Sequence, residues 1–130
     1  MVRVIYRCGH EGDVLSRRDA TGTRRRALRH PCLDCAYRQA MNDPTVAPLT
    51  NGTRAQIVAA YNIRSRLRDR FAYAIIQARL RHQDDVAQVL WNIRRTLGHK
   101  RDAMRIMRIR DQWDEILERY EQGEHHGQQQ

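Results

Sequence analysis

The chain has 130 residues, enough for one domain or for one domain with a small appendage. Its 24 basic residues outnumber its 15 acidic ones, the formal net charge is +9, and Lys100 is the only lysine. There is no N-terminal apolar stretch and no run of ten apolar residues. This pattern argues against a signal peptide and a membrane span, and we expect a cytoplasmic protein.

The first 41 residues contain all three cysteines. Enrichment in Val, Ile and Tyr predicts a short strand over residues 2–8, and a second, shorter strand is predicted over residues 13–18. We expect a short helix from about Thr23 to Arg29, because proline disfavours helix in the residue before it and Pro31 follows. The segment "LDCAYRQAM" then begins another helix at the second cysteine pair.

Residues 42–52 contain two prolines and no sustained period, which predicts a linker. Residues 53–122 show apolar residues at helical spacing and predict three helices with short connections, so that neighbours are antiparallel and share one core. Residues 123–130 are low in complexity and predict a disordered tail. The expected fold class is α+β, mostly α, with a zinc-binding module over residues 1–41. The predicted helical core consists of Ile57, Leu67, Phe71, Ile75, Leu90, Ile93, Ile106, Trp113 and Ile116.

Polar residues and a glycine mark the ends of the predicted helices. Thr50 or Thr53 can cap the start of the first helix, because a hydroxyl oxygen can accept from the free backbone N–H groups there. Asp84 or Asp85 can cap the second helix in the same way, and Gly98 is a natural residue for its C-terminal cap.

Two close pairs of metal-ligating residues stand out in the N-terminal segment. Cys8 and His10 flank a glycine, and Cys32-x-x-Cys35 follows after twenty-one intervening residues. Two such pairs suit tetrahedral zinc, since each pair can chelate from one tight turn. His30, two residues before Cys32, is the rival for the fourth position. A complete set of four ligands leaves no open position, so we predict one structural zinc ion.

A redox pair and plain burial are the competing hypotheses for the cysteines. A thioredoxin-like Cys-x-x-Cys needs a strand–helix–strand setting that this sequence lacks.

The segments "YRCGHEGDVLS" and "CLDCAYRQ" resemble those of small bacterial and phage-encoded proteins of unassigned function, whose N-terminal halves read CGHEG…CPxC. Those proteins continue with a segment of the form LTGSxKQxAWAxxIR, to which "PLTNGTRAQIVAAYNIR", residues 48–64, is similar. Where that segment has Trp this chain has Ala59, and Leu33 replaces the Pro after the first late cysteine. The resemblance implies a zinc-ribbon or treble-clef-like module joined to a helical region, and it brings no known activity. The shared positions are Leu49, Thr50, Gln56, Ile57, Ala60, Ile63 and Arg64.

The positive charge is concentrated in the helical segment. Residues 50–110 carry fourteen basic against four acidic residues, whereas residues 111–130 carry one Arg against six acids. A basic excess suggests an acidic partner, most often nucleic acid, and arginine suits phosphate because its planar fork donates two parallel hydrogen bonds. The predicted nucleic-acid-binding residues are Arg24, Arg25, Arg26, Arg66, Arg70, Lys100, Arg101, Arg105 and Arg108.

Two arginines fall on the apolar face of the first predicted long helix. Arg64 and Arg68 lie within its apolar stripe, and a buried unpaired guanidinium is too costly to persist. Either an acid of the third helix pairs with them, which we favour, or this face is partly open to a partner. The acids of the third helix could also pair with Arg79 and Arg81, because the first and third helices are expected to run parallel.

No catalytic constellation is evident. The sequence lacks a Gly-rich phosphate loop, a deaminase motif and a nucleophile elbow, so we expect no enzyme and no small-molecule substrate. The favoured function is a zinc-stabilised, nucleic-acid-binding accessory protein of the kind that a mobile element encodes, with DNA or RNA as partner. The alternative is a protein-binding adaptor or inhibitor that docks on an acidic surface of a larger machine.

Overall fold

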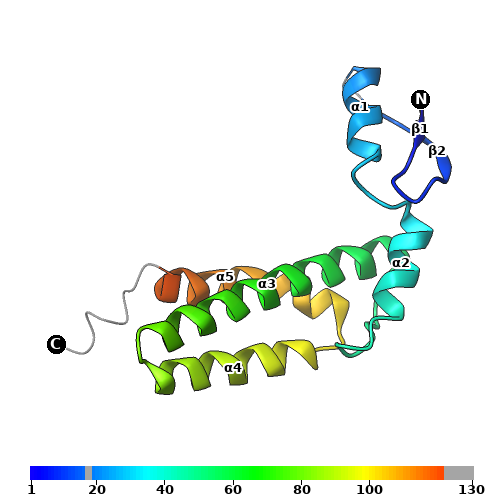
Figure 1. Cartoon of the computed structure of the whole chain (residues 1–130). Helices are drawn as coiled ribbons and strands as arrows, with labels where there is room; N and C mark the ends of the chain where they lie inside the picture. The colour runs from blue at the N-terminus through cyan, green and yellow to red at the C-terminus, as the bar shows by residue number, and fades with distance from the viewer. Residues whose placement is uncertain (17–18, 122–130) are drawn as a thin grey trace.

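The computed structural model describes residues 1–16 and 19–121. This part of the chain forms a two-stranded antiparallel sheet and five helices, so the protein is mostly helical with a small N-terminal sheet, as predicted (Figure 1). The tail predicted over residues 123–130 lies outside the described residues.

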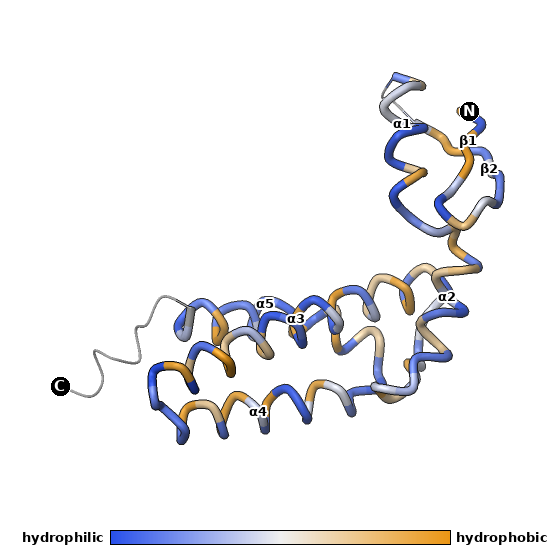
Figure 2. Tube along the Cα trace, viewed as in Figure 1, coloured by the Kyte–Doolittle hydropathy of each residue, from blue (hydrophilic) through white to orange (hydrophobic). Residues whose placement is uncertain are grey.

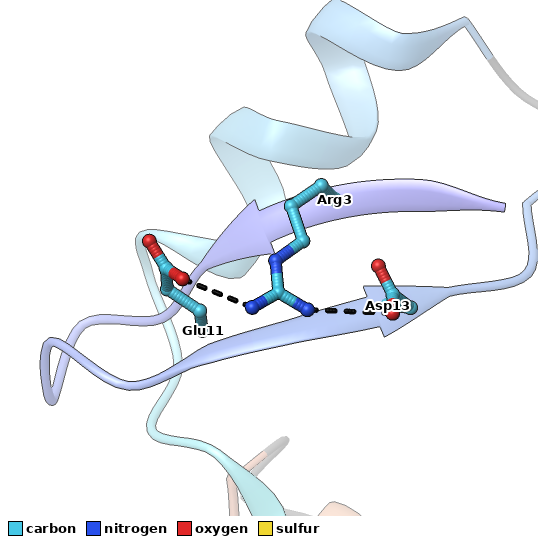
Figure 3. A network of polar contacts seen from close by, with 3 residues as sticks. All are labelled: Arg3, Glu11 and Asp13. Carbon is cyan, nitrogen blue, oxygen red and sulfur yellow. Dashed lines mark hydrogen bonds and ion pairs between the residues drawn. The ribbon is translucent and has the colours of Figure 1, made fainter.

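The chain begins with a hairpin of β1 (Val2–Ile5) and β2 (Glu11–Val14). Its register pairs Val4 with Gly12 and Arg3 with Asp13. Both strands are shorter than predicted, and β2 starts earlier, because the turn between them closes within residues 6–10 through hydrogen bonds from Tyr6 N to His10 O and from Gly9 N to Tyr6 O. On one face of the hairpin, Arg3 reaches across to two acids of β2, Glu11 at 2.9 Å and Asp13 at 3.3 Å (Figure 3).

Helix α1 (Ala20–Ala27) packs against β1. It starts three residues before the predicted Thr23, because the Asp19 carboxylate caps it by accepting from Gly22 N. The two elements share a very small core in which Val4, Thr23 and Ala27 are buried.

Helix α2 (Leu33–Met41) joins this small unit to the long helices. Its N-terminal end carries the second cysteine pair, and its buried Ala40 packs into a cluster with Ile57 and Ala60 of the next helix. On the surface, Arg54 pairs with Asp34 at 2.7 Å and lies over the Tyr37 ring. The α2 helix therefore belongs to both halves of the fold.

The remaining helices are α3 (Arg54–Leu80), α4 (Asp84–Gly98) and α5 (Ala103–Glu121). The 27 residues of α3 span about 40 Å at the usual helical rise. Figure 1 shows α4 running back along α3, and α5 lying beside α3 in the same direction as α3. The parallel pair lets Arg70 of α3 form an ion pair with Asp114 of α5 at 2.8 Å.

Two apolar clusters hold the helices together. One joins the C-terminal half of α3 to α4 and α5, and the other joins its N-terminal half to α2, Leu49 and the start of α5. Along α4, hydrophobic residues (orange) and hydrophilic residues (blue) alternate from turn to turn (Figure 2). Of the predicted core, Ile93, Trp113 and Ile116 are partly buried against the first cluster. The buried members are Ile57, Leu67, Phe71, Ile75, Leu90 and Ile106.

The helix ends agree with the prediction at one of three positions. Thr53 caps α3 in a reciprocal box, in which Gln56 N donates to Thr53 Oγ1 and Thr53 N donates to Gln56 Oε1. Asp84 and Asp85 are not caps, because they lie in the first turn of α4 after the cap residue Gln83. Gly98 is not the C-terminal cap either, because it is the buried last residue of α4 and the cap residue is His99.

The predicted linker, residues 42–52, lies against the helices. Leu49 is only 1% exposed, Ala47 N donates to Gly98 O, and Thr50 N donates to Arg101 O. Tyr61 of α3 donates its hydroxyl proton to Asp43 at 2.7 Å. The segment is thus an ordered connection that follows the junction between α4 and α5.

Within the described residues, the two arginines of the apolar stripe do not pair with an acid. Arg64 is fully buried, and its Nη1 donates to Ala47 O at 2.9 Å and to Lys100 O at 2.6 Å. Arg68 Nη1 donates to Arg94 O at 3.2 Å. The predicted pairing with an acid of α5 is therefore wrong for both, because backbone carbonyls at the ends of neighbouring segments supply the acceptors.

Candidate metal centre and basic surface

The first ligand pair comes from the turn of the hairpin. Cys8, Gly9 and His10 form this turn, and Gly9 adopts φ +87°, a left-handed conformation that glycine accepts without strain. The turn is tied to the loop before α2, since Arg7 N donates to His30 O at 2.9 Å. Both Cys8 and His10 are exposed.

The second pair comes from the start of α2. Cys32 is the N-terminal cap residue of this helix, and Cys35 follows one turn later. A spacing of three residues on a helix brings two side chains to the same side, so both thiols face the hairpin turn. The backbone N–H of Cys32 donates to Cys8 Sγ at 3.3 Å, which ties the two pairs together.

The four ligand atoms lie within 4.8 Å of one another, close enough to hold a metal ion. His10 Nδ1 is 3.4 Å from Cys8 Sγ, 3.4 Å from Cys32 Sγ and 3.3 Å from Cys35 Sγ. In a tetrahedral site with metal–sulfur bonds of about 2.3 Å and metal–nitrogen bonds of about 2.0–2.1 Å, this separation is about 3.5 Å. The donor set and the spacing therefore fit a tetrahedral ion held through Nδ1 of His10.

The alternative ligand His30 is not a member of this group among the described residues. Its side chain is exposed, and it contributes to the site only through its backbone carbonyl, which accepts a hydrogen bond from Arg7 N. His10 fills the position because it follows Cys8 in the same tight turn.

The electrostatics of the group favour a bound cation. The hydrogen bond from the backbone of Cys32, followed by that from His10, lowers the pKa of Cys8 to about 6. The hydrogen bond with Cys32, followed by burial, raises the pKa of Cys35 to about 11. Sulfurs this close oppose one another's ionisation, and a divalent cation between them would remove that conflict by favouring the thiolate form.

The predicted basic residues are spread over both halves of the molecule. Arg25 and Arg26 are exposed on α1, whereas Arg24 Nε donates to Arg3 O. Arg70 is only partly exposed and is paired with Asp114, so it is not free for phosphate. Lys100 is half-buried, and the exposed members on the helical part are Arg66, Arg101, Arg105 and Arg108.

One basic feature was not predicted from the sequence. A cavity lined by Arg68, Arg94, Arg95 and Arg101 lies between the 44–47 segment and the end of α4. Of these only Arg101 was predicted to bind nucleic acid. The adjacent Arg94 and Arg95 were a visible signal, but their proximity to Arg68 depends on the pairing of α3 with α4.

Comparisons with known proteins give no relative. No family model matches the chain, and neither a curated protein nor a solved structure is significantly similar to it. None of the helices in the described part of the chain is both long and apolar enough to cross a membrane.

Proposed function

We propose that this chain is a zinc-stabilised, basic, nucleic-acid-binding accessory protein. The cluster of three thiols and one imidazole supports zinc as the metal, since this is a common donor set of tetrahedral structural zinc sites. With four protein ligands the ion has no open position, so its role is structural. Cys8, His10, Cys32 and Cys35 would hold it.

A structural role also agrees with the size of the N-terminal unit. The described residues before Cys32 bury only Val4, Thr23 and Ala27, which is too little apolar surface to stabilise a folded unit of this length. Metal binding would supply the missing free energy, because the site forms only in the folded chain. A ligand pair from a hairpin turn and another from a helix start is the arrangement of treble-clef-like modules, and we assign the unit to that class.

The observation that supports nucleic acid is a set of exposed basic residues without acidic partners among the described residues. Arg25 and Arg26 lie on α1, Arg29 follows the end of this helix, and others lie on α3 and α5. The acids of the hairpin do not neutralise α1, because Arg3 already pairs with Glu11 and Asp13. A surface of this kind binds phosphates through charge and counterion release, largely independently of sequence. A mobile element is the setting that we propose for such a protein.

The test is the salt dependence of binding. Affinity of the full chain for labelled duplex DNA and for structured RNA is measured by fluorescence anisotropy at several salt concentrations. Contacts with about four to six phosphates would give a log–log slope of about −0.9 per contact for duplex DNA.

A charge-reversed variant locates the surface. Lys100→Glu with Arg101→Glu and Arg105→Glu should weaken binding strongly, while circular dichroism stays unchanged. The matched control is Arg79→Glu with Arg81→Glu and Arg119→Glu, which changes the net charge equally at the other end of the long helices. An equal loss of affinity in both variants would indicate only a general effect of net charge, and it would contradict a binding surface around Lys100, Arg101 and Arg105.

A second function rests on a different observation. Tyr73, Ile76 and Leu80 are exposed at helical spacing on one face of α3, and such a stripe suits a protein partner. Absence of binding to both duplex DNA and structured RNA at low salt would exclude the first function. The adaptor would then be favoured, with this apolar stripe and the basic face together as its docking surface for an acidic protein.

A further inference from the structure

A cavity of about 390 Å³ opens beside the end of α4, remote in sequence from the cysteine cluster. Its walls are the 44–47 segment, the last two turns of α4, Arg68 of α3 and the loop that leads to α5. The volume falls in the range of small-molecule sites. The lining residues include four arginines and His99 but no acid.

The inner arginines of this cavity are held in place by backbone contacts. Arg68 Nη1 donates to Arg94 O at 3.2 Å, and Arg94 Nε donates to Arg68 O at 3.0 Å. Gly98 leaves room for this pair of hydrogen bonds, because a Cβ atom at that position would overlap Arg68 Nη1. Each guanidinium carries five N–H donors, so both keep unused donors after these bonds.

A third arginine lies directly behind the wall and forms no ion pair with any acid that the structure describes. Arg64 Nη1 donates to the carbonyl of Ala47, a residue of the lining, while Arg64 Nε and Nη2 are buried without a hydrogen-bond partner. Burial, then the charge of Arg68, lowers the pKa of Arg64. Burial, then the charge of Arg94, lowers the pKa of Arg68.

Asp43, an acid whose charge acts on both Arg64 and Arg68, already accepts hydrogen bonds from other groups. Asp43 accepts hydrogen bonds from Thr45 N, Thr45 Oγ1 and Tyr61 Oη. Its charge favours the ionised form of Arg64 and Arg68, and the charge of Asp69 adds to this effect at Arg68, but these two acids face a larger group of arginines. A group of partly buried cations with so little compensation is costly, and an anion in the cavity would relieve the repulsion.

An aromatic ring lies at the rim. Trp91 is 41% exposed and lines the cavity, and the guanidinium of Arg95 lies 5.8 Å from its ring centroid. An exposed indole next to arginines is a platform on which a nucleobase stacks, and the stacking tolerates any base. Because an inorganic anion has no ring to stack, the Trp91 indole favours a nucleotide over a simple inorganic anion as the ligand.

We propose that this cavity binds the phosphate of a nucleotide unit through Arg68, Arg94, Arg95 and Arg101, with the base against Trp91. The inference rests on the proposed nucleic-acid function and deepens it, since it names one built site within an otherwise diffuse basic surface. Arginine favours phosphate because its fork donates two charge-assisted hydrogen bonds. The nucleotide is either part of a strand or free.

The test follows tryptophan fluorescence of the full chain in the Trp113→Phe background, where Trp91 is the remaining tryptophan. The probes are oligothymidylate, thymidine monophosphate, thymidine and inorganic phosphate at low salt. Thymidylate in either form should quench Trp91, and thymidine should bind at least tenfold more weakly. A strand that binds much more tightly than the mononucleotide identifies nucleic acid as the source, and equal affinity identifies a free nucleotide.

Two variants separate this cavity from the general basic surface. Arg95→Gln with Arg101→Gln should reduce oligothymidylate affinity at least tenfold, given about 1.5–3 kcal/mol for each hydrogen bond to a charged group. The control Arg79→Gln with Arg81→Gln removes the same charge elsewhere and should change it less than threefold. Gly98→Ala keeps every charge but displaces the flexible end of Arg68, and should also weaken binding.

The failures of the two proposals differ. If the chain binds oligothymidylate but both double variants and Gly98→Ala bind equally well, the cavity is not the site and the diffuse basic surface remains. If neither oligothymidylate nor duplex DNA nor structured RNA binds, both proposals are overturned. Quenching by thymidine equal to that by thymidine monophosphate would also overturn the phosphate site.

Discussion

The buried guanidinium of Arg64 donates a hydrogen bond to the backbone carbonyl of Lys100 at 2.6 Å. The same nitrogen donates to the carbonyl of Ala47 at 2.9 Å. One side chain of α3 thereby fastens both the 42–52 segment and the connection between α4 and α5. An arginine is long enough to cross the apolar layer and ends in several donors, which no apolar residue could provide.

Replacing Arg64 by Met should destabilise the protein. The change removes a buried charge, but it leaves two partly buried carbonyls without this donor, and an unsatisfied buried group costs about 1–3 kcal/mol. We expect a net loss of about 1–3 kcal/mol in the free energy of unfolding, measured by urea denaturation. Arg66→Met, an exposed neighbour on α3, is the control and should stay within about 0.5 kcal/mol. A variant as stable as wild type would mean that the buried charge costs as much as its hydrogen bonds contribute.

The Arg64 contacts show where sequence reasoning reaches its limit. Helical spacing correctly placed Arg64 on the buried face of α3, because that depends on local periodicity. Its partners are carbonyls of residues 17 and 36 positions away, which no local pattern reveals. The sequence correctly predicts that α3 and α5 run parallel. The ion pair between them joins Arg70 to Asp114. Among the described residues, neither Arg79 nor Arg81 pairs with an acid of α5.

Asp43 should make the protein sensitive to acid. Hydrogen bonds from the Thr45 hydroxyl and then from Tyr61 lower the pKa of Asp43 below the ordinary value of about 3.9. A lowered folded-state pKa contributes stability that is present above about pH 4 and is lost as the pH falls through the folded-state pKa. We expect Asp43→Asn to be less stable than wild type at pH 7 and the difference to shrink below pH 4.

The measurement is the midpoint of thermal unfolding from pH 7 to pH 2 for wild type and variant. Comparing the two cancels the effect of acid on the metal site, which both share. Asp69→Asn, which replaces an exposed acid of α3, serves as the control. Its difference in unfolding midpoint from wild type should not shrink in the same way as the pH falls. A difference between wild type and Asp43→Asn that is constant with pH would refute this role of Asp43.

The capping box at the start of α3 should contribute measurably to stability. Thr53→Ala removes the acceptor for Gln56 N, and loss of such a cap costs about 0.5–2 kcal/mol. Thr50→Ala is the informative control, since the hydroxyl of Thr50 makes only an exposed contact of 3.3 Å with Arg101 O. Thermal unfolding should show the larger loss for Thr53→Ala, and the reverse order would contradict the assigned cap.

The two candidate sites differ in how far the sequence predicts them. The candidate metal ligands form two close pairs, so each pair can be recognised in the sequence, whereas the fold that brings the two pairs together cannot. The cavity takes Arg68, Trp91 and Arg101 from three separate segments, together with residues 44–47. Only the packing of α3 against α4 brings them together, so no sequence pattern could reveal it.

The metal prediction begins with stoichiometry. Protein purified without chelator should contain one zinc ion per chain by elemental analysis. His10→Ala should lose the metal, because Nδ1 of His10 lies 3.3–3.4 Å from all three sulfurs, whereas His30→Ala should retain it. Retention in His10→Ala and loss in His30→Ala would show that the fourth ligand is misassigned.

Removal of the metal should unfold one end of the molecule. The hairpin and α1 bury little beyond Val4, Thr23 and Ala27, so a chelator should abolish their structure at neutral pH. Helices α3, α4 and α5 have their own core around Leu67, Phe71 and Leu97, and most of the helical circular dichroism should remain. Hydrogen exchange after chelation should therefore rise steeply over residues 1–30 and little over residues 57–117. Uniform loss of protection along the chain would instead mean that the long helices depend on the metal site through α2.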